Sequence, residues 1–309
     1  MILKLKELKE LKELTVLILT YQTKKEIIFN CLKSINNKVK IVIVENSKKF
    51  LFETEIKKKF PNTKIFCTGK NLGYGAGNNF GIKLIETKYV FILNPDTICD
   101  NNLFDNIPKV INSAKNFTII GCQYIDDKIY MPAGFFDTKK NHFFKKNFLE
   151  IRKIKPLTKV EWVTGCSMLL NLSKFKHKKI FDENIFLYFE ELDLCKSIIN
   201  KGEKIYTSSL LKIKHLGFKS SLGNNIKVKE NTKKIREWHW MWSTFYFYKK
   251  NYSYFYAIYK IYGKFTKSIF KTIFFLLTFQ KEKKDKYLHR FLGMFNAIIG
   301  RSASFRGKI

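Results

Sequence analysis

The segment YVFILNPDT, residues 89–97, places five apolar residues directly before Asn94-Pro95-Asp96. A continuous apolar run of this kind is typical of a strand that is buried on both faces, as in a parallel sheet. Asp96 follows the predicted strand and has two interpretations. It is a turn or helix N-cap residue, or it is a carboxylate that holds a divalent cation between two phosphates.

The segments on the N-terminal side of this strand alternate between strand-like and helix-like patterns. Strands are predicted at residues 15–20, 39–44 and 64–67, and helices at residues 24–35, 50–60 and 78–86. This β-α-β alternation predicts an α/β fold with a mostly parallel, Rossmann-like sheet that is flanked by helices. Ligands bind such sheets at the carboxyl ends of the strands, where Glu45-Asn46-Ser47 and Asn94-Pro95-Asp96 are expected to lie.

The segment KNLGYGAGNNFGI, residues 70–82, carries four glycines between a predicted strand and a predicted helix. It lacks the Lys-Ser/Thr pair of a P-loop, and its glycine spacing is not that of G-x-G-x-x-G. The glycines can let backbone N–H groups approach a ligand closely. Alternatively, they form a tight turn and allow close packing of the following helix.

The segment FLYFEELDLC, residues 186–195, gathers Glu190, Glu191 and Asp193 in a chain with 58 Lys plus Arg and only 26 Asp plus Glu. The helix macrodipole favours carboxylates in a first helical turn. That effect explains one or two of these acids, but not their position beside Phe186 and Phe189. A carboxylate within hydrogen-bond reach of a hydroxyl group is suited to general-base catalysis.

The formal net charge of +32 would normally indicate nucleic acid or a membrane surface as a partner. Only five of the 58 basic residues are arginine, however, and arginine is the residue that base and phosphate recognition favours. Nucleic acid is therefore not expected as a partner, and a solvated lysine-rich face is the simplest explanation of the charge.

The six cysteines are widely spaced and include no C-x-x-C motif. This pattern excludes the usual zinc-binding spacings and indicates reduced thiols in the cytoplasm. No secretory signal is recognisable. The apolar run at residues 273–279 is too short to span a bilayer.

Residues 222–309 differ in composition from the rest, with 19 basic and 4 acidic residues and 22 of the 49 aromatic residues. We predict a helical region here, which contains WHWMWSTFYFYKK at residues 238–250. Trp and Tyr favour membrane interfaces and Lys favours anionic headgroups, which indicates peripheral attachment to a membrane. The alternative is that these aromatic side chains pack on the preceding domain or on a second subunit.

Residues 1–13 are interpreted as a charged extension and residues 126–160 as a variable insertion.

His215 is a single histidine, and most single histidines are structural or exposed. Together with Asp96 it could supply a nitrogen ligand to the same metal ion.

Taken as a set, five segments between residues 14 and 221 resemble an inverting family 2 glycosyltransferase of the GT-A fold, in its rhamnosyltransferase-like branch. These segments are NLGYGAGNNFGI, LNPDT, WVTGCSMLL, FDENIFLYFEELDLC and KHLGFKSS. Residues 222–309 are similar to the helical C-terminal extension of that family.

The resemblance implies a donor site and a metal site. The implied donor-binding residues are Thr20, Tyr21, Glu45, Asn71, Gly73, Asn94, Asp96, Trp162 and Gly165. Asn94-Pro95-Asp96 corresponds to the D-x-D metal motif of the family, with Asn94 in place of the first aspartate. Asp96 and His215 are therefore the implied ligands of Mg²⁺ or Mn²⁺.

The resemblance also implies the catalytic residues and the reaction. Glu191 would be the base, Glu190 would bind a substrate hydroxyl, and Asp193 would share the face of Glu190 or cap the helix. The enzyme would move a sugar from dTDP-rhamnose or a UDP-sugar to a glycan or polyprenyl-linked acceptor with inversion, in cell-surface polysaccharide synthesis. It would work in the cytoplasm on the inner face of the membrane, and a homo-oligomer is compatible with the sequence. The alternative is a non-catalytic membrane- or nucleic-acid-binding protein on an α/β scaffold.

Overall fold

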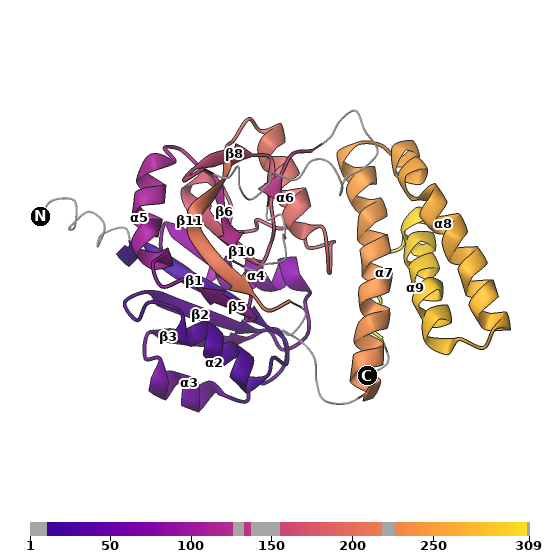
Figure 1. The fold of residues 1–309 in the computed structure, drawn as a ribbon, viewed down its shortest axis with the longest axis horizontal. Coiled ribbons are helices and arrows are strands. Elements are labelled where there is room, and N and C mark those ends of the chain that lie inside the picture. Colours follow the sequence, from indigo (N-terminus) through magenta and orange to yellow (C-terminus); the bar gives the residue numbers. More distant parts are fainter. Residues whose placement is uncertain (1–10, 126–132, 137–154, 218–225, 308–309) are drawn as a thin grey trace, which may run out of the picture.

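The computed structural model describes residues 11–125, 133–136, 155–217 and 226–307 (Figure 1). The strands are β1 (Leu14–Thr20), β2 (Lys40–Glu45), β3 (Thr63–Cys67), β4 (Tyr89–Leu93), β5 (Thr97–Cys99), β6 (Ile119–Tyr124), β7 (Ala133–Gly134), β8 (Thr158–Val160), β9 (Trp162–Val163), β10 (Ser167–Asn171) and β11 (Ile205–His215). The helices are α2 (Lys25–Lys33), α3 (Glu53–Lys59), α4 (Tyr74–Lys83), α5 (Leu103–Ser113), α6 (Glu190–Asn200), α7 (Ile226–Asn251), α8 (Tyr254–Leu277) and α9 (Lys281–Ile298), with a 3₁₀ turn, η2, at Leu172–Lys174. The predicted charged extension lies mostly outside the described residues, as do the predicted insertion and the domain boundary at 221/222.

The main sheet has the strand order β3-β2-β1-β4-β10-β6-β11-β5, and β8 pairs with β11. The first four strands of this order pair in parallel, as predicted from the apolar runs. Beyond β4 the sheet is mixed, because β10 runs antiparallel to both β4 and β6. The α/β prediction is therefore confirmed, and the parallel arrangement is limited to β1–β4 and to the β6–β11 pair.

The two faces of the sheet are covered by different helices. Alternate residues of β1 point to opposite faces: Val16 and Ile18 lie in a core shared with α2, α3 and α5, whereas Leu17 lies in a core shared with α4, α6 and α7. Both faces of β1 are covered by these cores, which is why the centre of this strand is a continuous apolar run rather than an alternating one.

Helix α4 begins four residues earlier than the predicted residue 78, because the glycine-rich segment forms its first turns. A Cβ atom added at Gly81 would lie 2.5 Å from Leu17 Cδ1, and one added at Gly77 would lie 2.7 Å from Leu19 Cδ1. These distances are too short for any side chain, so the two glycines let α4 approach β1 closely. Helix packing is thus the role of these two glycines.

Helix α7 lies between the sheet domain and the pair α8 and α9 (Figure 1). The aromatic residues predicted to contact a membrane are mostly buried on α7: Trp238, Trp242 and Phe245 are at most 4% exposed. The indole N–H of Trp242 donates to the Arg301 carbonyl at 2.9 Å. The preference for membrane contact through these three side chains is therefore wrong, and the packing alternative applies to them. Among the described residues, no helix combines the length and the apolar character needed to cross a membrane.

Candidate active site

The two predicted metal ligands meet at one end of the sheet. Strands β5 and β11 are antiparallel with Thr97 opposite His215, which places Asp96 beside the histidine. Asp96 Oδ1 lies 3.4 Å from His215 Nε2. Asp96 is 2% exposed, and its Oδ1 has no hydrogen-bond partner among the described residues. A buried carboxylate oxygen without a hydrogen bond, next to an imidazole nitrogen, fits a divalent cation, since both atoms are suitable ligands.

Hydrogen bonds and a ring stack fix the polypeptide around Asp96 and His215. The carbonyl of Asn94 accepts from Thr97 N at 3.1 Å and from Thr97 Oγ1 at 2.5 Å, which closes a tight turn. The ring of Tyr124 stacks on His215 with centroids 6.0 Å apart. The Tyr124 hydroxyl contacts Cys166 Sγ at 2.7 Å, and Asn94 N donates to the Cys166 carbonyl at 2.8 Å. Tyr124 and Cys166 therefore help to position the predicted ligands, and sequence reasoning did not identify either of them.

The acidic pair begins helix α6. Tyr188 and Phe189 precede it with φ of 69° and 72°, a left-handed conformation that costs free energy for bulky residues. Two consecutive residues of this kind turn the chain sharply into the helix. Glu190 is 2% exposed, and its Oε1 has no hydrogen-bond partner among the described residues, whereas Glu191 is half-buried. The strained turn thus delivers two adjacent carboxylates into a largely desolvated place.

Burial raises the pKa of both carboxyl groups. The negative charge of Glu191 raises the pKa of Glu190 further. Glu191 lies against Gly165, where an added Cβ atom would be 3.4 Å from Glu191 Cβ and 3.5 Å from the Tyr74 hydroxyl oxygen. Tyr74 donates its hydroxyl hydrogen to the Gly165 carbonyl. A carboxyl group with a raised pKa accepts a proton more readily at neutral pH, as a general base must.

The variant Glu190→Gln should be more stable than the wild type at neutral and alkaline pH. Because the folded-state pKa is raised, the wild type loses stability as pH rises from the unfolded pKa through the folded one. An amide removes that charge and can also donate a hydrogen bond, so we expect a gain of about 1–3 kcal/mol. Thermal melting at pH 5 and pH 8 measures this gain in stability. The difference in melting temperature between the variant and the wild type should be larger at pH 8 than at pH 5. A variant that is less stable at both pH values would contradict the prediction.

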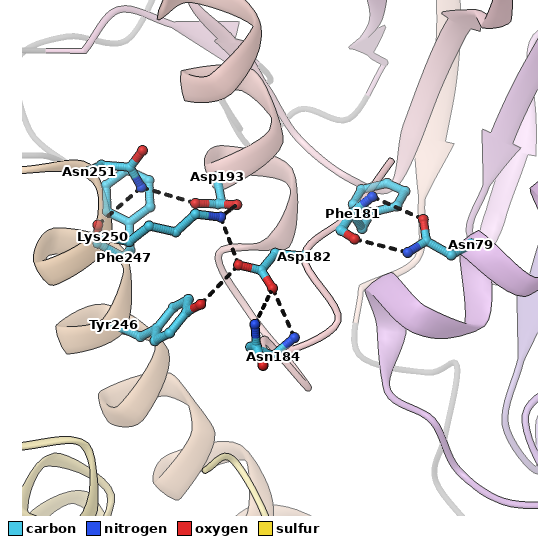
Figure 2. A network of polar contacts seen from close by, with 9 residues as sticks. All are labelled: Asn79, Phe181, Asp182, Asn184, Asp193, Tyr246, Phe247, Lys250 and Asn251. Atoms are coloured by element: carbon cyan, nitrogen blue, oxygen red, sulfur yellow. Dashed lines mark hydrogen bonds and ion pairs between the residues drawn. The ribbon is translucent and has the colours of Figure 1, made fainter. Parts of the chain in front are cut away.

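Asp193 does not join the acidic pair. Its Oδ2 accepts from Lys250 Nζ at 2.6 Å and its Oδ1 from Asn251 Nδ2 at 3.0 Å, and both donors come from α7. Figure 2 shows Lys250 between Asp193 and Asp182, to which it also donates at 2.7 Å. Tyr246 donates to Asp182 as well. The structure thus places the Asp193 carboxylate in a polar network that joins α6 to the C-terminal helices.

The network suggests a test of the contact between α7 and the segment that carries the acidic pair. Lys250→Met removes two ion pairs and leaves the largely buried Asp193 with a single donor, so unfolding should be easier by about 1–2 kcal/mol. Loss of an exposed ion pair costs about 0–1 kcal/mol, whereas removal of one partner of a buried pair costs about 3–5 kcal/mol. We expect a value between these because the Lys250 side chain is 39% exposed. Chemical denaturation measures the change. Lys249→Met, at the neighbouring exposed position, is the matched control, and equal losses in the two variants would contradict the assignment.

Thr20 and Glu45 occupy the adjacent carboxyl ends of β1 and β2, where they pair in register. Glu45 is 1% exposed, and its two oxygens accept from Thr20 Oγ1 at 2.7 Å and from Gln22 N at 3.1 Å. Both oxygens are therefore already engaged in holding the turn after β1. Tyr21, within that turn, is half-buried.

Asn46 organises the glycine-rich segment. Its Nδ2 donates to Asn71 Oδ1 at 3.1 Å and to the Gly73 carbonyl at 3.0 Å, and its Oδ1 accepts from Leu72 N at 2.9 Å. The structure thus brings Asn71 and Gly73 beside the end of β2. Sequence reasoning noted Asn46 only as part of a polar turn, and its position directly after a buried strand is the signal that could have identified it.

The two predicted residues of the WVTGCSMLL segment have different surroundings. The Trp162 side chain is 5% exposed, lies in the apolar core, and donates its indole N–H to the Phe135 carbonyl at 3.2 Å. Gly165 lies at the acidic pair, and the next residue, Cys166, accepts from the Asn94 backbone. Residues 165–166 therefore connect the acidic pair to the turn that carries Asp96.

A mixed α/β sheet with a buried acidic pair and an Asp–His pair at its strand ends is the arrangement expected of a GT-A glycosyltransferase. The chain belongs to glycosyl transferase family 2, whose sequence model matches residues 15–176. The family assignment and the GT-A fold class predicted from the sequence are confirmed, and the catalytic alternative is favoured over a non-catalytic binding protein.

Curated relatives are distant. The chain is 24% identical over 183 residues to the rhamnosyltransferase WbbL of Escherichia coli, a match that covers 53% of this chain and 68% of that protein. It is 24% identical over 193 residues to the low-salt glycan biosynthesis hexosyltransferase Agl10 of Haloferax volcanii, covering 59% of this chain and 60% of that protein. The matched region thus spans about two thirds of each relative.

Solved structures share the fold at low sequence identity. A crystal structure of GalNAc-T7 with UDP, GalNAc and Mn²⁺ is 13% identical with a TM-score of 0.55, and the match covers 78% of this chain and 51% of that one. The mannosyltransferase PcManGT from Pyrobaculum calidifontis, in complex with GDP-Man and Mn²⁺, is 9% identical with a TM-score of 0.51, covering 93% and 87%. These likenesses show the fold alone.

Proposed function

We propose that the protein is an inverting, divalent-metal-dependent glycosyltransferase that transfers a sugar from a nucleotide-diphospho-sugar to a glycan or glycolipid acceptor. The observation that carries the proposal is the position of residues 165–166, with the half-buried Glu191 of the acidic pair on one side and the turn that carries Asp96 on the other. The names of the relatives support rhamnose or another hexose as the transferred sugar and the synthesis of a glycan as the process, and we propose dTDP-rhamnose or a UDP-sugar as the donor.

In this proposal the carboxyl ends of β1, β2 and β4 hold the donor. Asn71 and Gly73 line the nucleotide pocket, and Thr20, Tyr21 and Glu45 shape the part that receives the base and ribose. Glu45 would act mainly by fixing the turn, because both of its oxygens are engaged. Trp162 supports the wall of the site from within the core.

Asp96 and His215 would hold Mg²⁺ or Mn²⁺, since their unbonded oxygen and imidazole nitrogen converge. When bound, such a cation neutralises the negative charge that develops on a departing diphosphate. Among the described residues no third His, Cys, Asp or Glu joins them.

Glu191 would take the proton from an acceptor hydroxyl as that oxygen attacks the anomeric carbon. The new carbon–oxygen bond forms on the face opposite the bond to the diphosphate, which breaks and releases the nucleoside diphosphate, so the configuration inverts. Glu190 would bind a substrate hydroxyl beside it. Tyr74 keeps its proton, because burial first and the Glu191 charge second raise its pKa, and it can therefore hold the Gly165 carbonyl throughout.

We further propose that the acceptor is carried by a polyprenyl diphosphate lipid and that the enzyme works on the cytoplasmic face of the membrane. The six cysteines are all unpaired, which supports a reducing compartment. The net charge of +32 supports contact with an anionic membrane surface.

Thermal shift with a panel of nucleotide sugars tests the proposal. With Mn²⁺ present, the true donor at a hundred times its Kd should stabilise the protein by about 2.7 kcal/mol. dTDP-rhamnose and UDP-sugars should be the strongest ligands, and the NMR coupling at the anomeric position of the product should show inversion. The proposal fails if no nucleotide sugar stabilises the protein, or if the transferred sugar retains its configuration.

A further inference from the structure

Helix α8 is apolar on two opposite sides. One side packs on α7 and α9 through Ala257, Ile261 and Phe275, which are at most 9% exposed. The other side carries large apolar side chains at intervals of three, four or eight residues, and each is between 52% and 82% exposed. These residues are Phe255, Tyr259, Tyr262, Phe270, Ile273 and Leu277. We call this set the α8 stripe.

The α8 stripe faces away from the rest of the protein. In Figure 1, α8 is the outermost helix, on the far side of α7 from the sheet. A contiguous row of exposed aromatic and aliphatic side chains along 24 residues of helix is uncommon on a soluble surface and marks an interaction site.

The end of α8 extends this apolar surface. Leu276 is 58% exposed, and Phe279, in the turn that leads to α9, is 93% exposed. Phe279 has φ of 54°, a left-handed conformation that is costly for a bulky residue. This conformation ends the helix, as the bond from Gln280 N to the Phe275 carbonyl at 3.0 Å shows, and it leaves the phenylalanine side chain projecting into solvent beside the stripe.

The charges around the stripe identify that partner. Helix α8 carries four lysines and no acidic residue. Lys267 is exposed on the helix, and Lys281 and Lys283 are exposed directly after the turn with Phe279. Glu282 lies between them and is also exposed, so the net charge of this surface is still positive. A second copy of the chain would bring like charges together on this face, whereas an anionic bilayer offers negative headgroups around an apolar interior.

We propose that the α8 stripe and Phe279 lie in the interfacial layer of an anionic lipid bilayer. The apolar side chains enter the boundary between headgroups and acyl chains, and the lysines extend to the phosphates. The helix then lies on the membrane rather than crossing it. This surface is distinct from the buried α7 aromatics, and the proposal does not depend on the identity of the sugar or of the acceptor.

Co-sedimentation of the full chain with lipid vesicles tests the proposal. The wild type should partition onto vesicles that contain phosphatidylglycerol far more strongly than onto pure phosphatidylcholine. The triple variant Phe270→Ser, Leu277→Ser and Phe279→Ser should lower that partition coefficient by about tenfold or more. The variant Leu51→Ser and Leu84→Ser is the matched control, since it removes exposed apolar side chains from the sheet domain (75% and 42% exposed) and should bind as the wild type does.

A local probe separates this surface from general charge attraction. Cys67 is the exposed cysteine and the other five are buried, so a Cys67→Ser background allows labelling of Phe279→Cys with an environment-sensitive fluorophore. Its emission should shift to the blue with phosphatidylglycerol vesicles, and a label at Leu51→Cys should not shift.

Equal vesicle binding by the triple variant and the wild type would overturn the proposal. So would conversion of an oligomer to a monomer by the triple variant without loss of vesicle binding, since the stripe would then be a self-interface. Because no donor sugar is present, failure here leaves the proposed transferase activity untouched.

Discussion

Replacing Glu191 by glutamine is expected to lower kcat for sugar transfer by about 10²–10⁴-fold, because a positioned general base contributes that much. Glutamine has the same shape, and Glu191 rests against Gly165 without filling a core position. The donor should therefore still bind with unchanged affinity. Single-turnover transfer at saturating donor measures the chemical step, and thermal shift with the donor measures binding.

Three variants make the Glu191 test specific. Glu191→Asp should recover part of the activity, because the shorter carboxylate can still take a proton from a slightly displaced acceptor. Glu190→Gln should weaken acceptor use, seen as a higher KM, more than it lowers kcat. Glu86→Gln, at an exposed position after α4, should have no effect. If Glu191→Gln transferred sugar at nearly the wild-type rate, Glu191 would not be the base.

The raised pKa of Glu191 also predicts the shape of the pH profile. The base works only when it is ionised, so kcat/KM falls as pH drops through the pKa of the free enzyme's base. Burial raises that pKa, so the acid limb should lie above the value of about 4.3 that is usual for a glutamate. Glu191→Asp should keep an acid limb, whereas the residual activity of Glu191→Gln should lack it.

The first half of the fold was predictable because its signals are local. The strands β1, β2, β3 and β4 are short, largely apolar runs, and each of the first three is followed by a helix that crosses back over the sheet to the next parallel strand. Strand β10 has the same apolar character, yet it runs antiparallel to β4. Burial on both faces produces the same pattern in either direction, so only the tertiary arrangement decides the direction of β10.

Some residues of the candidate site were also predictable from local sequence, whereas their long-range contacts were not. The acidic pair was visible because three acids beside aromatic residues are unusual in a basic chain. Asp193 could be placed near Glu190 from helical spacing, but its donors Lys250 and Asn251 lie on a helix about sixty positions away, and no local pattern reveals them. Asp96 and His215 are about twice as far apart in the sequence, and only the resemblance to a known family paired them.

The aromatic residues of the C-terminal region show why composition alone misassigns surfaces. Trp238 and Phe245 have the residue types of a membrane interface, but α7 places them against the sheet domain and α9. The exposed row lies instead on α8, whose residues include Phe255 and Leu277 and no tryptophan. Both helices are rich in apolar residues around much of their circumference, so periodicity does not identify which side is covered. That distinction depends on the position of each helix in the bundle.

Asp96→Asn should abolish high-affinity binding of Mn²⁺ in the presence of nucleoside diphosphate and lower kcat by about 10²–10³-fold, because stabilisation of the leaving group is lost. His215→Ala should weaken metal binding by a smaller factor, because the carboxylate of Asp96 supplies the negative charge that attracts the cation. Isothermal titration with Mn²⁺ and the nucleoside diphosphate measures the affinity. Asp100→Asn, which removes a charge just past β5, is the control and should bind metal normally.

Stability distinguishes a ligand from a structural residue at Asp96. Its buried Oδ1 has no hydrogen-bond partner among the described residues, so its charge is costly when no cation is bound. Without metal, Asp96→Asn should therefore melt at a higher temperature than the wild type, whereas with Mn²⁺ and nucleoside diphosphate the order should reverse, because only the wild type gains binding free energy. An aspartate that merely held the turn would lower the melting temperature under both conditions when replaced, and that result would exclude Asp96 as the metal ligand.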